Sequence, residues 1–180
     1  MKGSLDNSQV VSDFYFKEIF MNIFLPYEND VKKSVQSLDD LRLNKQILEC
    51  YQLLSNAIKE QRGEQIKGYR NHPIYVHYKE NIGFLAVYGQ QCCREYHIRF
   101  RKCHKLNQSF WEVCYSTDSL NYVPFYMEGS KGQPNYIRTT ENVSNLYQQK
   151  LINKWDNDIK NGRPPRWTNR EVPTFYKGDK

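Results

Sequence analysis

The longest regular pattern of apolar positions lies between residues 34 and 62. Apolar side chains recur there at the spacing of one helix face: Leu41, Ile47, Leu48, Tyr51, Leu54 and Ile58. Polar side chains of both charge signs share a stripe on the other side: Arg42, Lys45, Gln46, Glu49 and Gln52. We therefore predict a helix that begins near Ser34 or Ser37 and ends at about Arg62, before Gly63. Ser37 and Asp40 have the spacing of a capping box for this helix.

A second long helix is predicted over residues 74–105. Its start is marked by Asn71–Pro73, because asparagine caps helices well and proline is tolerated in the first turn. Gly83 and Gly89 are candidate breaks or points of close packing within it. Four aromatic residues of this segment are expected in the core: Tyr75, Tyr78, Phe84 and Tyr88.

The C-terminal third contains a short helix, a loop and a last helix. Residues 109–115 suggest the short helix, and residues 116–138, rich in proline and glycine, read as a long irregular loop of the kind that is more often functional than connective. Thr139 or Thr140 caps the last helix, which runs to about Lys160 and is stopped by Gly162. Its apolar side has six members: Val143, Leu146, Tyr147, Leu151, Ile152 and Trp155.

The chain is expected to form one mainly α domain over residues 21–180. No segment shows convincing strand alternation and no internal repeat is visible, while 180 residues suffice for one core. Residues 21–27 read as a short buried start of this domain, and residues 163–176 as an extended, basic and aromatic tail. Residues 1–20 look appended, and we expect them to be a poorly ordered extension.

Charge and aromatic content favour a nucleic-acid partner. The net charge is +6, and five cations against Glu95 alone account for most of it: Arg94, Arg99, Arg101, Lys102 and Lys105. Such a local excess is typical of proteins that bind a polyanion. Several of the 14 tyrosines stand beside basic residues, where rings suit unstacked bases. For most tyrosines, a place at the edge of the core is the expected role.

The cysteine pattern indicates a reducing, cytoplasmic compartment and no metal. The five cysteines are odd in number and follow no secretory signal. A zinc site from Cys92, His97, Cys103 and His104 lacks the paired spacing of zinc ligands, so we reject it. We expect no cofactor, and no membrane contact because no apolar run approaches the roughly 20 residues needed to span a bilayer.

From Met21 onward the order of features resembles the pyrimidine-dimer DNA glycosylase family. Shared features are an apolar first strip, the acid-and-arginine helix over residues 38–49, and a His-led helix in which His72 is followed by Lys79 and by the pair Glu95 and Arg99. The tail, with Trp167 and the pair 175–176, resembles the family's C-terminal Trp and Tyr motif. A closer resemblance is to an uncharacterised bacterial and phage subgroup that carries L-D-D-x-R-L-x-K-Q-x-x-E and N-H-P.

The resemblance implies a DNA-repair glycosylase with abasic-site lyase activity. A neutral amine attacks the sugar C1′ of the damaged nucleotide and forms a Schiff base, which permits strand cleavage by β-elimination. A carboxylate stabilises the cationic character of the sugar and moves protons. Cationic residues hold a bent duplex with one nucleotide extruded.

The amine and the acid each have more than one candidate here. The α-amine of Met21 would serve if translation starts there, because its pKa lies far below that of lysine. Lys45 would serve if Arg42 lowers its pKa, and is equally suited to contact a phosphate. The family's acid directly follows an arginine, whereas Arg42 is followed by Leu43, so the acid comes from elsewhere. Glu49 is the favoured acid, since Asp40 is better placed to cap the helix.

Contacts with damaged duplex DNA are expected from eight residues: Arg70, His72, Lys79, Arg94, Arg99, Arg101, Trp167 and Tyr176. His72 has an equally good structural interpretation as a helix-entry residue. We expect a monomer. Two alternatives remain, a non-catalytic nucleic-acid-binding protein on the same scaffold, and a different hydrolase that uses the stripe of Asp40, Arg42, Gln46 and Glu49.

Overall fold

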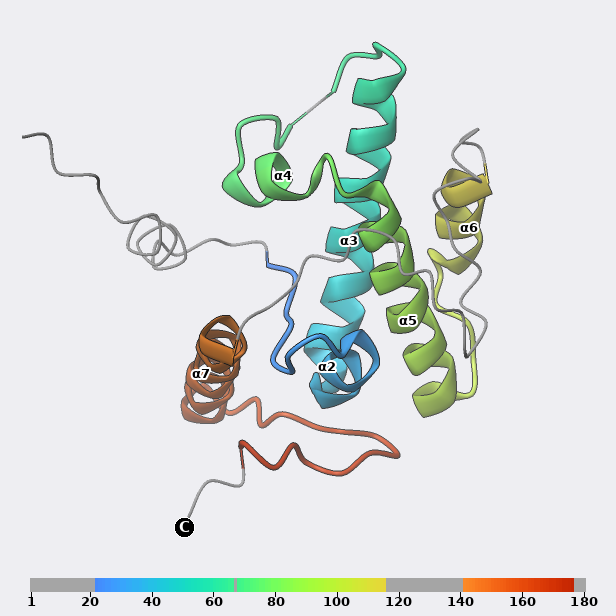
Figure 1. Ribbon diagram of the computed structural model, residues 1–180. Coiled ribbons are helices and arrows are strands. Elements are labelled where there is room, and N and C mark those ends of the chain that lie inside the picture. The colour runs from blue at the N-terminus through green and yellow to red at the C-terminus, as the bar shows by residue number, and fades with distance from the viewer. Residues whose placement is uncertain (1–21, 67, 116–140, 177–180) are drawn as a thin grey trace, which may run out of the picture.

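The computed structural model describes residues 22–66, 68–115 and 141–176, and helices dominate all three ranges (Figure 1). The helices are α2 (Val31–Ser37), α3 (Asp40–Gln61), α4 (Pro73–Tyr78), α5 (Ile82–Phe100), α6 (Asn107–Tyr115) and α7 (Glu141–Lys160). No strand occurs within the described ranges, so the mainly α prediction is confirmed. None of the helices in these ranges is long and apolar enough to cross a bilayer. The predicted extension over residues 1–20 and the predicted loop over residues 116–138 lie outside the described ranges, as do Thr139 and Thr140.

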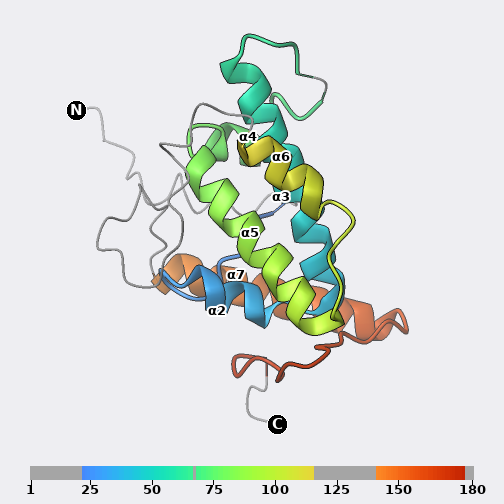
Figure 2. The same cartoon turned by 90° about the vertical axis from the view of Figure 1, so that its right-hand side faces the viewer.

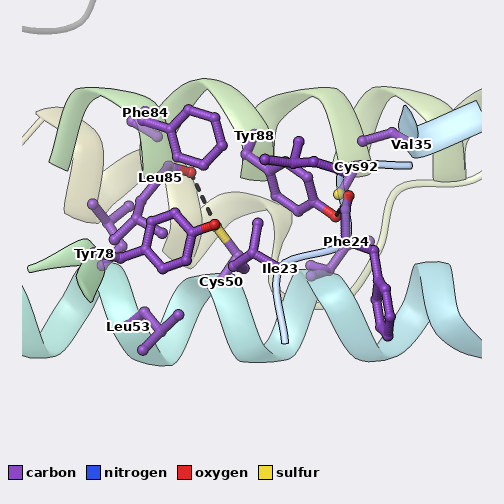
Figure 3. Packing of buried hydrophobic residues seen from close by; sticks show 14 of the residues in the cluster. Ile23, Phe24, Val35, Cys50, Leu53, Tyr78, Phe84, Leu85, Tyr88 and Cys92 are labelled. Carbon is purple, nitrogen blue, oxygen red and sulfur yellow. Dashed lines mark hydrogen bonds between the residues drawn. The ribbon is translucent and has the colours of Figure 1, made fainter. Parts of the chain in front are cut away.

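The core lies between α3 and α5, which pack side by side (Figures 1 and 2). Both helices contribute fully buried apolar side chains: Leu43, Ile47, Cys50, Leu53 and Leu54 from α3, and Leu85, Tyr88 and Cys92 from α5. Ile23 and Phe24 of the first described segment reach into the same cluster (Figure 3). The buried start predicted for residues 21–27 is therefore confirmed over residues 22–26. The four aromatic residues expected in the core of the second long helix are all buried.

The first predicted helix is two helices, and this prediction was wrong in its start and in its cap. α2 and α3 are separated by Leu38, whose backbone is extended, and by Asp39. The guanidinium of Arg99 donates hydrogen bonds to the carbonyl oxygens of Gln36 (2.9 Å) and Leu38 (2.7 Å). These bonds satisfy backbone acceptors that a continuous helix would have paired internally, which stabilises the break.

The predicted capping box does not form. Asp30 caps α2, because its carboxylate accepts a hydrogen bond of 2.7 Å from the backbone nitrogen of Lys33. The hydroxyl of Ser37 instead donates to the carbonyl oxygen of Ser34. Asp40 accepts hydrogen bonds from Thr168 in the distant tail, so one side chain that local spacing assigned to a cap is used in a tertiary contact and the other in a local bond.

The second predicted helix is also divided, but not at its glycines. The break between α4 and α5 lies at residues 79–81, and it brings Tyr78 and Phe84 into a stacked pair with ring centroids 5.6 Å apart. Gly89 lies inside α5 where α6 packs: a Cβ added there would lie 2.1 Å from the Phe110 ring. The helix ends at Phe100 because Arg101 adopts a left-handed conformation, earlier than predicted.

The C-terminal part follows the prediction where it is described. α7 ends at Lys160, and Tyr147, Leu151 and Trp155 of its predicted apolar side are buried. The tail then crosses the base of the molecule in an extended path (Figure 2). Three aromatic residues of the tail surround the buried Trp155 ring, with centroid separations of 5.0, 5.8 and 4.7 Å: Trp167, Phe175 and Tyr176.

Candidate functional site

Burial along α3 differs from the predicted division into an apolar face that includes Leu41 and Leu48 and a polar stripe that includes Gln46 and Glu49. Gln46 and Glu49 are buried, with exposed fractions of 1% and 6%, whereas Leu41 and Leu48 are exposed, at 57% and 43%. The prediction was wrong because the first segment packs on α3 in an extended form. Its backbone groups have no helical partners of their own, so the surface that covers them must be polar.

Gln46 provides those partners. Its Oε1 accepts hydrogen bonds from the backbone nitrogen of Phe24 (3.1 Å) and from the hydroxyl of Tyr88 (2.7 Å). Its Nε2 donates to the carbonyl oxygen of Asn22 and to Oε2 of Glu49, the latter at 2.8 Å. One buried amide therefore joins the first segment, α5 and the Glu49 carboxylate.

Glu49 lies where the first segment meets the solvent-facing side of α3. Its carboxylate accepts hydrogen bonds from Gln46 and from the backbone amide of Asn22, and it lies 3.4 Å from Nζ of Lys45. Burial raises the pKa of Glu49 above its ordinary value, although Lys45 opposes the shift. A carboxyl group that binds protons more readily than usual, yet touches a cation, is suited to proton transfer and to stabilising positive charge.

α7 brings a second lysine, Lys154, into the electrostatic environment of this carboxylate. Asp158 forms an ion pair with Arg42, and Nε1 of Trp155 donates a hydrogen bond of 2.9 Å to Asp39, so α7 lies against the start of α3. Lys154, one turn before Asp158, is half-buried. Burial and the nearby charges of Lys45 and Arg42 lower the pKa of Lys154, and Glu49 lies within the same electrostatic environment.

Sequence reasoning did not single out Lys154. The sequence gives only a weak indication of a role for Lys154. Lys150, Lys154 and Asp158 follow each other at four-residue spacing, as charged residues on solvated helix faces often do. Burial also lowers the pKa of Lys150. Lys154 becomes a candidate site residue only because α7 packs against the start of α3, which brings it into the electrostatic environment of Glu49.

Several predicted site residues have structural partners instead. Nη1 of Arg99 donates to Asp40 at 3.1 Å and Nε donates to Glu95 at 2.8 Å, and the side chain is fully buried. In this conformation Arg99 cannot reach a phosphate. Asp40 is also held by Thr168, so it takes no part in a site with Glu49. This arrangement speaks against a hydrolase that would use Asp40 and Glu49 together.

The side chains of the aromatic tail and of the His72 turn also make contacts within the protein. Trp167 donates a hydrogen bond of 2.9 Å to the carbonyl oxygen of Ser37, and Tyr176 packs against Trp155. Nδ1 of His72 accepts a hydrogen bond from the backbone nitrogen of Ile74, which is the helix-entry role. Near it, Lys79 forms an ion pair with Glu60 at 3.6 Å.

The structure brings together one part of the predicted site and separates another. Arg42, Lys45, Gln46 and Glu49 lie on successive turns of α3, and Gln46 and Glu49 contact the first segment. The His72 turn and Arg70 lie near Glu60, which is 11 residues along α3 from Glu49 and so about 16 Å away along the helix axis. Arg94 and Arg101 are exposed on and after α5. Met21 lies outside the described residues.

The residues considered for zinc do not assemble. Cys92 and His104 are buried, while His97 and Cys103 are exposed. All five cysteines are free. Within the ranges that the structure describes, no group of three potential metal-binding side chains occurs.

The protein is therefore a small helical protein that holds a buried carboxylate, Glu49, beside the amines of Lys45 and Lys154. A sequence model of the pyrimidine dimer DNA glycosylase family matches residues 21–122, more than half of the chain. The chain therefore belongs to this family. Comparison with curated proteins and with solved structures finds no match. The matched segment contains Gln46 and Glu49, whereas α7 and the tail follow it.

Proposed function

We propose that the protein is a DNA-repair glycosylase with associated abasic-site lyase activity, acting on duplex DNA with pyrimidine-dimer-type damage. Its family membership supports a DNA substrate. The single observation that carries the proposal is the Glu49 carboxylate, buried beside the first segment with a raised pKa and with Lys45 at 3.4 Å.

The proposed chemistry needs an amine and a carboxylate at one sugar. The amine lone pair attacks C1′, the bond from C1′ to the base breaks, and the base leaves with the bonding electrons and takes up a proton. The bond from C1′ to the ring oxygen O4′ then breaks, O4′ takes up a proton, and the nitrogen lone pair forms the C1′=N bond of a protonated imine. Loss of a C2′ proton from this imine then expels the 3′ phosphate by β-elimination. Ionised Glu49 would stabilise positive charge on the sugar, and its raised pKa would help it to carry the transferred protons.

Two amines are candidates for the nucleophile. The backbone nitrogen of Asn22 hydrogen-bonds to Glu49, and the α-amine of a polypeptide that begins at Met21 belongs to the residue that precedes Asn22 in the sequence. Its pKa of about 7.7 to 8.0 would leave roughly a tenth to a sixth of it neutral at pH 7, far more than of a lysine with a pKa of about 10.4. Lys45 is the second candidate, and it would otherwise bind a phosphate.

Borohydride trapping on abasic-site DNA tests the proposal, because a covalent adduct requires an imine. We expect trapping by the protein that starts at Met1, at Met21, or both, and mass analysis of the adduct identifies the amine. Glu49→Gln should retain DNA binding and lose most of the trapped product. Glu64→Gln, at an exposed glutamate beyond α3, is the matched control and should trap normally. If neither starting point gives an adduct, the glycosylase and lyase proposal fails.

A non-catalytic DNA-binding protein is the second candidate. It is favoured by the extent to which Gln46 and Glu49 are engaged in holding the first segment, since that structural role alone explains their burial. In that case DNA binding persists with a strong dependence on salt concentration, but no adduct forms.

A further inference from the structure

The solvent-facing side of α3 carries two leucines in an unusual setting. Five large hydrophobic side chains are exposed among the described residues: Leu41, Leu48, Tyr69, Val76 and Ile159. Leu41 and Leu48 stand two helical turns apart on one face, with Lys45 between them. The side chain of Lys45 is 55% exposed, so all three protrude together.

This face has no carboxylate of its own. Its other members within the same arc of the helix are polar or basic: Asn44, Gln52, Ser55 and Lys59. Glu49 lies at the margin, where its carboxylate contacts Lys45. An apolar surface with lysines at its centre and end, whose one neighbouring carboxylate is buried at the margin, matches a ligand that combines negative charge with apolar rings and sugars, which is the chemistry of nucleic acid.

We propose that Leu41 and Leu48 form an apolar wedge that enters the DNA next to the nucleotide held at Glu49. The proposal rests on the proposed function, because that function places the target sugar at Glu49. Lys45 lies between the two leucines and 3.4 Å from the carboxylate, so the face that carries the leucines adjoins Glu49 and can contact the strand that holds the target sugar. Leu48 directly precedes Glu49 and is the better placed to fill the gap.

The physical reason for such a wedge is the cost of unstacking. Extruding a nucleotide exposes the apolar faces of its neighbours to water, and an inserted leucine covers them. A protruding leucine is itself unfavourable in water, so its burial in the gap contributes to binding of the opened duplex.

The test uses a duplex that carries a stable abasic-site analogue with 2-aminopurine as the neighbouring base. The fluorescence of 2-aminopurine rises when stacking is lost. We expect the full chain to produce a rise, and Leu48→Ala to shift the opening equilibrium back by roughly tenfold. Leu41→Ala should have a smaller effect in the same direction. Val76→Ala removes an equally exposed apolar side chain from α4 and should change nothing.

The outcomes separate the wedge from the proposed function. This readout needs binding but no chemistry, so it stands even if borohydride gives no adduct. Unchanged fluorescence with Leu48→Ala and Leu41→Ala, or an equal loss with Val76→Ala, overturns the wedge. A change in oligomeric state caused by the leucine substitutions, measured by light scattering without DNA, would show a contact between copies and overturn it as well. The melting temperatures of the variants verify that each has folded.

Discussion

Nε2 of Gln46 lies 2.8 Å from Oε2 of Glu49, and both side chains are buried one turn apart on α3. The same amide binds the backbone of Asn22 and Phe24, so the position of the first segment and the orientation of the carboxylate are set by one side chain. Stability and site geometry are therefore coupled at Gln46.

Gln46→Met should destabilise the protein by about 3 kcal/mol, because it leaves several buried partners of the amide without a hydrogen bond. Urea denaturation measures the loss. Gln61→Met, at the exposed end of the same helix, is the control and should cost less than about 0.5 kcal/mol. A small loss in the Gln46 variant would mean that the buried amide contributes little.

Glu49→Gln should stabilise the protein at pH 7 by about 1 kcal/mol while it removes trapping activity. The pKa of Glu49 is raised by burial, so its contribution to stability is present below the unfolded pKa and is lost as the pH rises through the folded pKa. The gain from the neutral glutamine should therefore vanish near pH 4. Denaturation at both pH values checks this, and an equal gain at both would contradict it.

Glu95 should show the opposite dependence on pH. Burial by itself would raise the pKa of Glu95, but hydrogen bonds from Arg170 and Arg99 outweigh it, and the pKa lies below its ordinary value. The resulting stability is present above the unfolded pKa and is lost as the pH falls through the folded pKa. Glu95→Gln should cost about 3 kcal/mol at pH 7 and progressively less below pH 4.5. A cost that does not change with pH would contradict the assignment.

Gly89→Ala should cost about 3 kcal/mol, because its Cβ would lie 2.1 and 2.2 Å from two atoms of the Phe110 ring. Phe110→Leu removes the ring and is itself destabilising. In a double-mutant cycle, the two substitutions together should cost less than the sum of the separate losses. Additive losses would show that α6 moves away from α5 without strain.

Lys154→Gln should shift the acidic limb of the trapping profile to higher pH, because the Lys154 charge lowers the pKa of Glu49. Trapping rates between pH 4 and 8 measure the shift. Lys160→Gln, at the exposed end of α7, is the control: it removes the same charge as Lys154→Gln and should leave the pH profile unchanged. Equal shifts in both would indicate an effect of overall charge.

The sequence determined the helical class and most of the helical segments, because the period of apolar residues reflects burial on one helix face. The last helix ends where Lys160 and Gly162 predicted, and the aromatic core residues of α5 are buried as expected. The breaks at Leu38 and at residues 79–81 were not predicted, since the carbonyl groups freed at the first one are satisfied by Arg99 from a helix about 60 residues away.

The sequence also selected Glu49, Lys45 and Arg42 as neighbours, because they are close in the chain and helix geometry fixes their spacing. Which of the side chains on α3 are buried and which are exposed was decided only by the tertiary structure. The extended first segment covers Gln46 and Glu49, α7 brings Lys154, and nothing in the described fold covers Leu41 and Leu48. The physical reason is that burial, and with it the pKa of a carboxyl group, depends on segments that are remote in the sequence.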